Sequence, residues 1–167
     1  MVFWAPILFW LAALLCTGVA IARAPAPRSL DLMAQKLLRY IALFPVGLMG
    51  LWAAVGHITF PEQAASAIGW ASSPFQFEVG VANLGIGMAG VIAAFSTNWG
   101  FRAAVAVMVC GFLGGAGVGH LVQISETGNM AAGNAGPILY TDMLTPLSLL
   151  VLLALTFRRE DQANHDG

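Results

Sequence analysis

Four ionisable side chains and one amide stand in otherwise apolar segments: His57, Glu78, Asn83, His120 and Asp142. Imidazoles and carboxylates together could pass protons, bind the polar head of a lipid or quinone, or hold a divalent metal such as Zn, Fe or Mn. Ionisable residues inside a membrane face the bundle interior or a wet cavity and mark functional sites by default. Neither histidine has a metal-binding spacing such as HxxxH, and a hydrogen-bonded network without chemistry is the alternative interpretation.

The composition shows which elements must position these side chains. The chain has 167 residues, of which 59% are hydrophobic and 9% charged. Soluble domains carry about 25% charged residues, so the sequence predicts an integral membrane protein. A membrane span needs about 20 apolar residues of helix. Five segments qualify, at 2–22, 40–60, 74–96, 103–123 and 137–157.

The basic residues all fall in loops on one side of this arrangement. They are Arg23, Arg28, Lys36, Arg39, Arg102, Arg158 and Arg159. The opposite loops carry Glu62 and Glu126 but no Lys or Arg. Cytoplasmic loops are enriched in Lys and Arg, so this pattern predicts an outside N-terminus and a cytoplasmic C-terminus. We expect a multi-pass protein of the bacterial cytoplasmic (inner) membrane.

The predicted fold is a single all-α, polytopic membrane helical bundle of five transmembrane helices. Residues 1–22 form an N-terminal anchor, kept as a span because no Lys or Arg precedes its apolar run. A basic cytoplasmic loop covers 23–39, a four-helix core 40–157 and a cytoplasmic tail 158–167. The two cysteines, Cys16 and Cys110, lie in apolar runs and indicate no metal site.

Helix-capping patterns occur in the outer loops. Thr59 and Glu62 have capping-box spacing, which predicts a short helix over 60–70. Ser73 as N-cap, followed by Pro74 and by Gln76 reaching back, predicts the start of the third span. The Gly- and Asn-rich loop 125–136 reads as an ordinary mobile connection.

The spans alternate in direction, and this brings the ionisable residues to similar depth. His57 and His120 end their spans, whereas Glu78 and Asp142 begin theirs. At 1.5 Å per residue each lies roughly 4–8 Å inside the outer boundary. We therefore expect one outer-leaflet cluster in which Glu78 faces the imidazoles and Asn83. The same four ionisable residues are the candidate metal ligands, and a haem between His57 and His120 is a further alternative.

Glycines recur at helical spacing in three spans. Small side chains let membrane helices approach closely, so these stripes predict helix–helix contacts, either within one chain or between copies. The residues are Gly47, Gly50, Gly80, Gly87, Gly90, Gly111, Gly115 and Gly119.

A long motif joins the second and third spans. It reads Trp52-x3-Gly56-His57, then Pro61, then Ile68-Gly69-Trp70-x2-Ser73-Pro74-Phe75-Gln76-x-Glu78-x-Gly80-x-Ala82-Asn83-Leu84. The motif resembles that of a family of small multi-pass prokaryotic membrane proteins, a domain of unknown function, over roughly 45–155. The core is more loosely similar to DoxX-like membrane proteins. The resemblance implies a helical membrane fold and no activity.

Three functions follow as expectations. The first is a small membrane protein whose outer-leaflet His/carboxylate site binds a small molecule, lipid headgroup, quinone or ion. The second is a non-catalytic accessory subunit that docks on a larger membrane complex, or on its own copies, through its glycine faces. The third is a metal- or haem-dependent oxidoreductase. The expected surroundings are the lipid bilayer, with no nucleic acid partner. No phosphate loop or dinucleotide fingerprint occurs.

Overall fold

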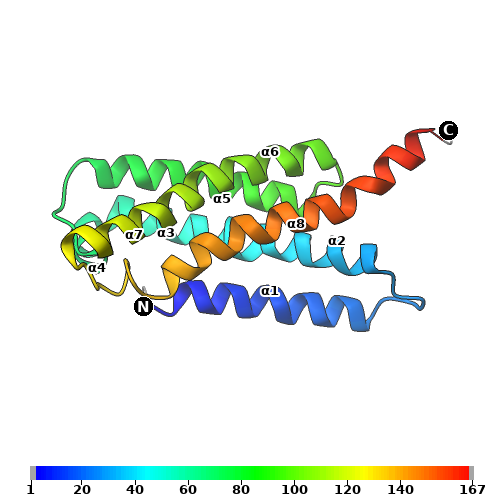
Figure 1. Cartoon of the computed structure of the whole chain (residues 1–167), viewed down its shortest axis with the longest axis horizontal. Coiled ribbons are helices and arrows are strands. Elements are labelled where there is room, and N and C mark those ends of the chain that lie inside the picture. Colours follow the sequence, from blue (N-terminus) through cyan, green and yellow to red (C-terminus); the bar gives the residue numbers. More distant parts are fainter. Residues whose placement is uncertain (1–2, 166–167) are drawn as a thin grey trace.

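The computed structural model describes residues 3–165, with side chains described as far as residue 157. This part of the chain is helical without strands, and five of its helices are long and apolar enough to cross a membrane. The helices lie side by side, with α4 and the end of α7 at one end of the bundle and the α1–α2 connection at the other (Figure 1). In chain order the elements are α1 (Ala5–Ala22), α2 (Leu30–Ile41), η1 (Ala42–Leu48), α3 (Met49–Thr59), α4 (Pro61–Ile68), α5 (Phe75–Phe95), α6 (Trp99–Val109), η2 (Cys110–Gly114), α7 (Gly115–Thr127) and α8 (Pro137–His165).

Two spans are longer than the sequence predicts, and each contains a π-helical segment. The helix Leu30–Thr59 passes through η1, and Trp99–Thr127 passes through η2. The first begins at Ser29, whose Oγ accepts a hydrogen bond from the backbone N–H of Leu32 at 3.2 Å. Residues 30–39 of the predicted basic loop are therefore helical. This segment buries Ala34, Leu38 and Ile41, one side of an amphipathic helix.

The predicted contact between the second and third spans is present as a close approach of α3 and η1 to α5. A Cβ added at Gly87 would lie 2.7 Å from the backbone nitrogen of Leu51, and one at Gly50 would lie 2.9 Å from the Cα of Gly87. Gly80, Gly47 and Gly90 are equally crowded. Only glycine permits backbones this close, so the two stripes hold these helices together.

The glycine stripe of the fourth span behaves differently. Gly111, Gly115 and Gly119 are exposed, and a Cβ at any of them would meet nothing within 4 Å. Within the described residues this stripe therefore makes no helix contact, and of the two possibilities left open by the sequence only packing against another chain remains a prediction. The glycine of this span that does make a close contact is Gly117, where a Cβ would lie 2.8 Å from Met143 Cε on α8.

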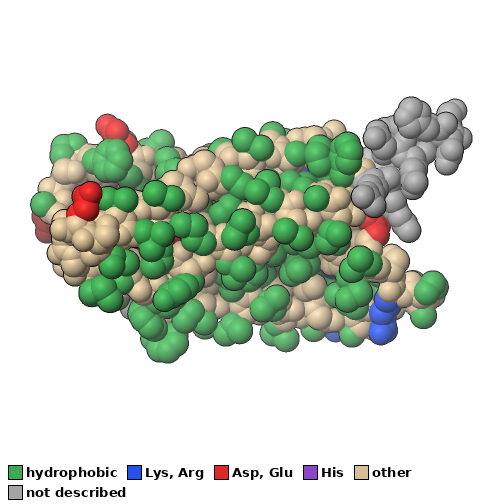
Figure 2. Space-filling model, viewed as in Figure 1, with side chains coloured by type: hydrophobic (Ala, Val, Ile, Leu, Met, Phe, Trp, Pro, Cys, Tyr) green, Lys and Arg blue, Asp and Glu red, His purple; other side chains and the backbone are tan. Residues whose placement is uncertain are grey.

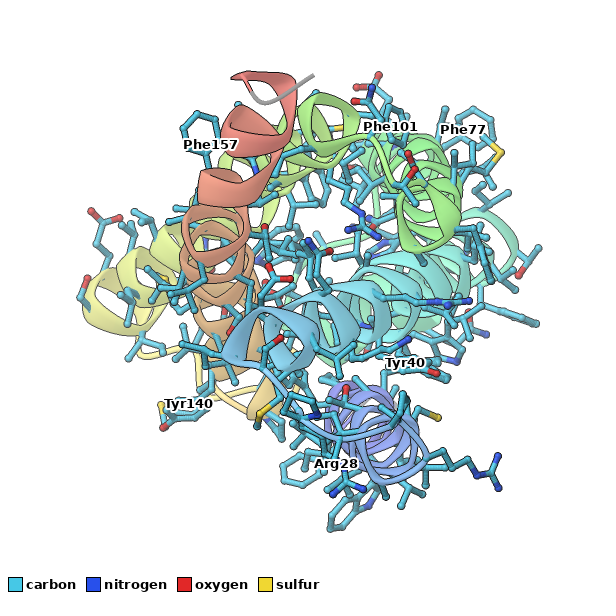
Figure 3. The ribbon with its side chains drawn as sticks, turned by 90° about the vertical axis from the view of Figure 1, so that its right-hand side faces the viewer. Arg28, Tyr40, Phe77, Phe101, Tyr140 and Phe157 are labelled. Carbon is cyan, nitrogen blue, oxygen red and sulfur yellow. The ribbon has the colours of Figure 1, made fainter. Side chains whose placement is uncertain are left out.

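Apolar side chains cover the outside of the bundle. Figure 2 shows hydrophobic groups along the whole visible face, with acidic groups at the α4 end and Lys or Arg at the opposite end, where one further acidic group lies. Viewed from that opposite end, Phe77, Phe101, Tyr140 and Phe157 point outward and α1 lies on the periphery (Figure 3). This surface matches a lipid environment rather than water. The side chains of 158–167, the expected tail, lie outside the described residues.

Candidate functional site

A cavity of about 780 Å³ occupies the interior toward the α4 end of the bundle. Its wall is mostly apolar and aromatic, and its polar members come from several different helices. The side chains that matter below are Trp10, His57, Trp70, Asn83, His120, Thr141, Asp142 and Thr145. Three of the four predicted ionisable residues, together with Asn83, thus line one cavity.

Helix α1 is part of this wall and not only a peripheral anchor. Pro6, Phe9 and Trp10 line the cavity. The indole nitrogen of Trp10 donates to Thr145 Oγ1 of α8 at 3.2 Å. Because this bond joins the first span to the last, α1 closes one side of the cavity.

The most buried polar group of the site is centred on His120. This residue and Asp142 are 8% and 5% exposed, and His120 Nε2 lies 3.5 Å from Asp142 Oδ2. The other ring nitrogen, Nδ1, lies 2.8 Å from Oδ1 of Asn134, an amide that is completely buried. The predicted meeting of the fourth and fifth spans is therefore present, with an asparagine added.

The loop that carries Asn134 is held by hydrogen bonds throughout, which corrects its prediction as an ordinary mobile connection. Gly133 donates its N–H to the carbonyl of Ala67 at 2.8 Å. Asn129 Nδ2 donates to the carbonyl of Ile68 at 2.9 Å. Both acceptors belong to α4, so the two connections at this end of the bundle are bonded to each other beside the cavity.

His57 has a similar but more open setting at the end of α3. Its Nδ1 lies 2.7 Å from Oε1 of Gln76, which is 1% exposed. Gln76 is thus the hydrogen-bond partner of the His57 imidazole. The prediction that its side chain reaches back to cap the helix is wrong. The N-cap of α5 is Pro74, without a side-chain cap. Thr59 likewise ends α3, where its hydroxyl bonds the carbonyl of Val55, and does not cap α4.

Asn83 lies on the crowded glycine stripe of α5. It is 8% exposed, and its Nδ2 donates to the carbonyl of Val79 at 2.9 Å. The amide oxygen makes no hydrogen bond within the described residues, which leaves it available on the cavity wall.

Glu78 does not join the others. It is exposed and does not line the cavity. Glu78 and Asn83 are five residues apart, which turns them about 140° from each other on an α-helix, so both cannot face the interior. A carboxylate in the first turn is instead favoured by the helix dipole.

The predicted metal set is consequently not assembled. Among the described residues, no three His, Cys, Asp or Glu side chains are grouped so that they could hold a metal ion. Glu78 points outward, and His120 and Asp142 form a pair without a third ligand of these types. The metal-dependent interpretation therefore has no ligand set in this part of the chain.

Two features of the site escaped prediction. Both π-helical segments border the cavity, through Pro45 and Val46 of η1 and through Phe112 and Leu113 of η2. Such wide turns are frequent at functional sites. The partners Gln76 and Asn134 were missed as well. The sequence does contain one sign that the two histidines have similar surroundings. Each lies in a similar tetrapeptide, VGHI at 55–58 and VGHL at 118–121.

Comparison with known proteins places the chain in a family. A family model described as DUF6790, a family of unknown function, matches residues 3–162. The chain belongs to DUF6790. The predicted resemblance to an uncharacterised family is thereby confirmed, whereas the likeness to DoxX-like proteins stays a prediction. No curated protein and no solved structure shows a significant match.

Proposed function

We propose that the protein binds a small amphipathic molecule in the cavity between its spans. The observation that carries this proposal is an interior space of about 780 Å³ with a largely apolar wall and a few convergent polar groups. Ligand sites in proteins have this character and span about 300–1,000 Å³. A lipid tail or an isoprenoid-like body would lie against the aromatic wall, and a polar head against His57, Asn83, His120 and Asp142.

We place this site in the outer half of a bacterial cytoplasmic membrane. The α4 end, where the cavity lies, carries Glu62 and Glu126. Arg28 lies beside the α1–α2 connection, and Arg102 of α6 donates to Gln35 of α2 at 2.7 Å. The basic residues of the described part therefore gather at the end away from the cavity, which supports an outside N-terminus.

Labelling tests the orientation. In a chain with Cys16 and Cys110 replaced by alanine, a membrane-impermeant maleimide should modify Gln63→Cys in intact cells. Arg28→Cys should react only after lysis. The reverse pattern would place the cavity in the inner leaflet.

Mass spectrometry of gently purified protein tests the binding itself. We expect a stoichiometric small molecule in the extract of the wild type and its loss from Ala116→Phe, because Ala116 lines the cavity. Ala104→Phe, an exposed position earlier in the same continuous helix, is the matched control. Equal contents in the wild type and both variants would contradict the proposal.

A second candidate function rests on the open glycine stripe. Gly111, Gly115 and Gly119 form a lipid-facing small-residue surface with no partner in the described chain. Such a surface suits docking to another membrane helix, as an accessory subunit would require. Gly115→Leu should then release a partner, or a second copy, that co-purifies in mild detergent. An unchanged particle size would remove this candidate.

A further inference from the structure

We infer that the buried pair His120–Asp142 holds one shared proton, that Asn134 fixes where this proton lies, and that the pair donates a hydrogen bond to a carbonyl-type oxygen of an uncharged ligand. The statement about the proton depends on the geometry of the protein alone. The statement about the ligand rests on the proposed function, and the experiment below separates the two.

The orientation of the Asn134 amide is fixed by its surroundings. Its Nδ2 lies 2.8 Å from the carbonyl oxygen of Asn129 and 3.5 Å from that of His120. Carbonyl oxygens can only accept, so the NH₂ group must point at them. The amide oxygen is then the atom that lies 2.8 Å from His120 Nδ1. An oxygen at that distance requires a donor, so Nδ1 carries a hydrogen.

The tautomer of His120 follows from this bond. A neutral imidazole has one hydrogen, and with that hydrogen on Nδ1 the other nitrogen, Nε2, is a bare acceptor. Nε2 faces Asp142 Oδ2 at 3.5 Å. A bare nitrogen and an ionised carboxylate would repel each other. The pair is attractive only with a second hydrogen, either on Nε2 as imidazolium with carboxylate, or on Asp142 as a carboxylic acid.

Burial favours the same conclusion. In both arrangements the pair has no net charge, whereas removal of the shared proton would leave one unpaired negative charge. Charge buried without a partner is costly in an apolar interior. The other titratable side chain on the cavity wall is His57, and Glu62 and Glu126 near this end are exposed. No Lys or Arg lines the cavity, so no described cation replaces the proton.

The same geometry selects the ligand. The Nε2–Oδ2 distance of 3.5 Å exceeds that of a good hydrogen bond, about 2.7–3.0 Å, so the shared hydrogen is free to bond a third atom. The indole N–H of Trp70, another wall residue, is also buried without a hydrogen-bond partner in the described chain. A ligand oxygen that only accepts, such as a ketone, ester or quinone carbonyl, satisfies such donors. A charged head would bring an uncompensated charge to an electrically neutral wall.

Nitrogen-15 NMR of the histidine side chains tests the proton. The sample is the full-length protein with ¹⁵N-labelled histidine in nanodiscs of ether-linked phosphatidylcholine, which lacks carbonyl groups. The chain has three histidines, so His120→Gln identifies the signals by their loss. We expect Nδ1 of His120 to be protonated, with the second proton on Nε2 or, by infrared difference against Asp142→Asn, on the carboxyl group. A bare Nδ1, or a neutral imidazole beside an ionised Asp142, would overturn the inference.

Two variants show whether Asn134 acts as a positioning residue. Asn134→Leu removes the acceptor of the Nδ1 hydrogen, so Nδ1 should become bare and Nε2, which faces Asp142, should carry the hydrogen of the neutral imidazole. Gln76→Leu, the corresponding change beside His57, should leave the His120 signals unmoved. If Asn134→Leu does not fold, Asn134→Asp keeps an acceptor at this position and should retain the protonated Nδ1. Loss of that proton in a folded Asn134→Asp would contradict the assignment.

Three probes of equal chain length test the ligand class: decan-2-one, decanoate and decylammonium. We expect the ketone to shift the His120 signals and to bind about tenfold more tightly than either ion, which is the effect of about one net hydrogen bond. Equal or weaker binding of the ketone would overturn the ligand class while leaving the proton assignment intact. Binding of none of the three, with the expected NMR pattern present, would count against the ligand class and the proposed cavity function. A change of the His120 signals on transfer to ester-linked lipid would identify the bilayer's own carbonyls as the source.

Discussion

The two histidines of the cavity belong to two helical hairpins, and the helices of each hairpin contact each other in a different way. In the first, α3 and α5 touch through glycines, and His57 is half-buried with Gln76 as its partner. In the second, α7 turns its glycine stripe outward and meets α8 through buried polar side chains around His120. Close backbone contact dominates in the first hairpin, whereas the second combines one close glycine contact, Gly117 with Met143, with a buried polar group. We therefore expect the two halves to respond differently to equivalent substitutions.

The largest effect should come from the glycine contact. Gly87→Leu would place a side chain against Leu51 N at 2.7 Å and Gly47 O at 2.9 Å, both backbone atoms that cannot move aside. We expect a loss of about 3 kcal/mol in the free energy of unfolding, measured by SDS titration in mixed micelles. Gly115→Leu, on the open stripe, should change it little. Equal losses would mean that crowding does not distinguish the two stripes.

Asn134→Leu should have the next largest effect. It removes the amide that serves His120 Nδ1 and the Asn129 carbonyl, leaving both without that partner in a buried setting. We expect a loss of about 2 kcal/mol in the same titration. Asn98→Leu, at the exposed cap of α6, is a control that removes an amide whose neighbours can bond to water. A smaller loss for Asn134→Leu than for this control would contradict the view that the second hairpin depends on its polar core.

Gln76→Leu should be milder, with a loss of about 1 kcal/mol. Gln76 is as buried as Asn134, but the imidazole it serves is partly exposed and can find water. Its distinctive consequence is a change in the NMR signals of His57 with those of His120 preserved. If Gln76→Leu destabilises the protein more than Asn134→Leu, the ranking of the two hairpins is reversed.

The smallest effect should come from Glu78→Gln. This side chain is exposed and away from the cavity, so neither the SDS midpoint nor the ketone affinity should change measurably. Asp142→Asn, which alters the acidic residue that does line the cavity, should lower the affinity for the ketone by about tenfold. A lower ketone affinity of Glu78→Gln would mean that this carboxylate does contribute to the binding site.

The sequence predicted the five long apolar helices well because an apolar run of about 20 residues indicates such a helix directly. It also brought His120 and Asp142 to one depth. It failed where direction around a helix matters: Glu78 has the right depth and the wrong face. It failed again where a polar residue had two possible roles. Gln76 fits a cap by spacing, and only the fold shows that His57 is its partner.

Glycine patterns illustrate the same limit. The stripes at Gly50 and Gly87 and at Gly111 and Gly115 look alike in the sequence, yet one is crowded and the other empty. The spacing of the glycines shows that one helix face carries only small residues, but it cannot show whether another helix packs against that face. The loop of Asn134 was misjudged for a related reason, since Gly and Asn indicate turns and also permit a tightly bonded connection.

In the two helices that contain them, the π-helical segments determine in which direction around the helix axis the later residues point. A wide turn accommodates one residue more than an α-turn, and each α-helical residue advances the helix by about 100°. If η1 closed into regular α-helix with all its residues kept, the extra residue would swing His57 about a quarter-turn relative to α2, and deletion of one residue there would cancel this swing. The same closure of η2, with no residue removed, would turn His120 away from Asp142. Both imidazoles thus owe their aim into the cavity to a register change in the middle of their helices, about two to three turns away.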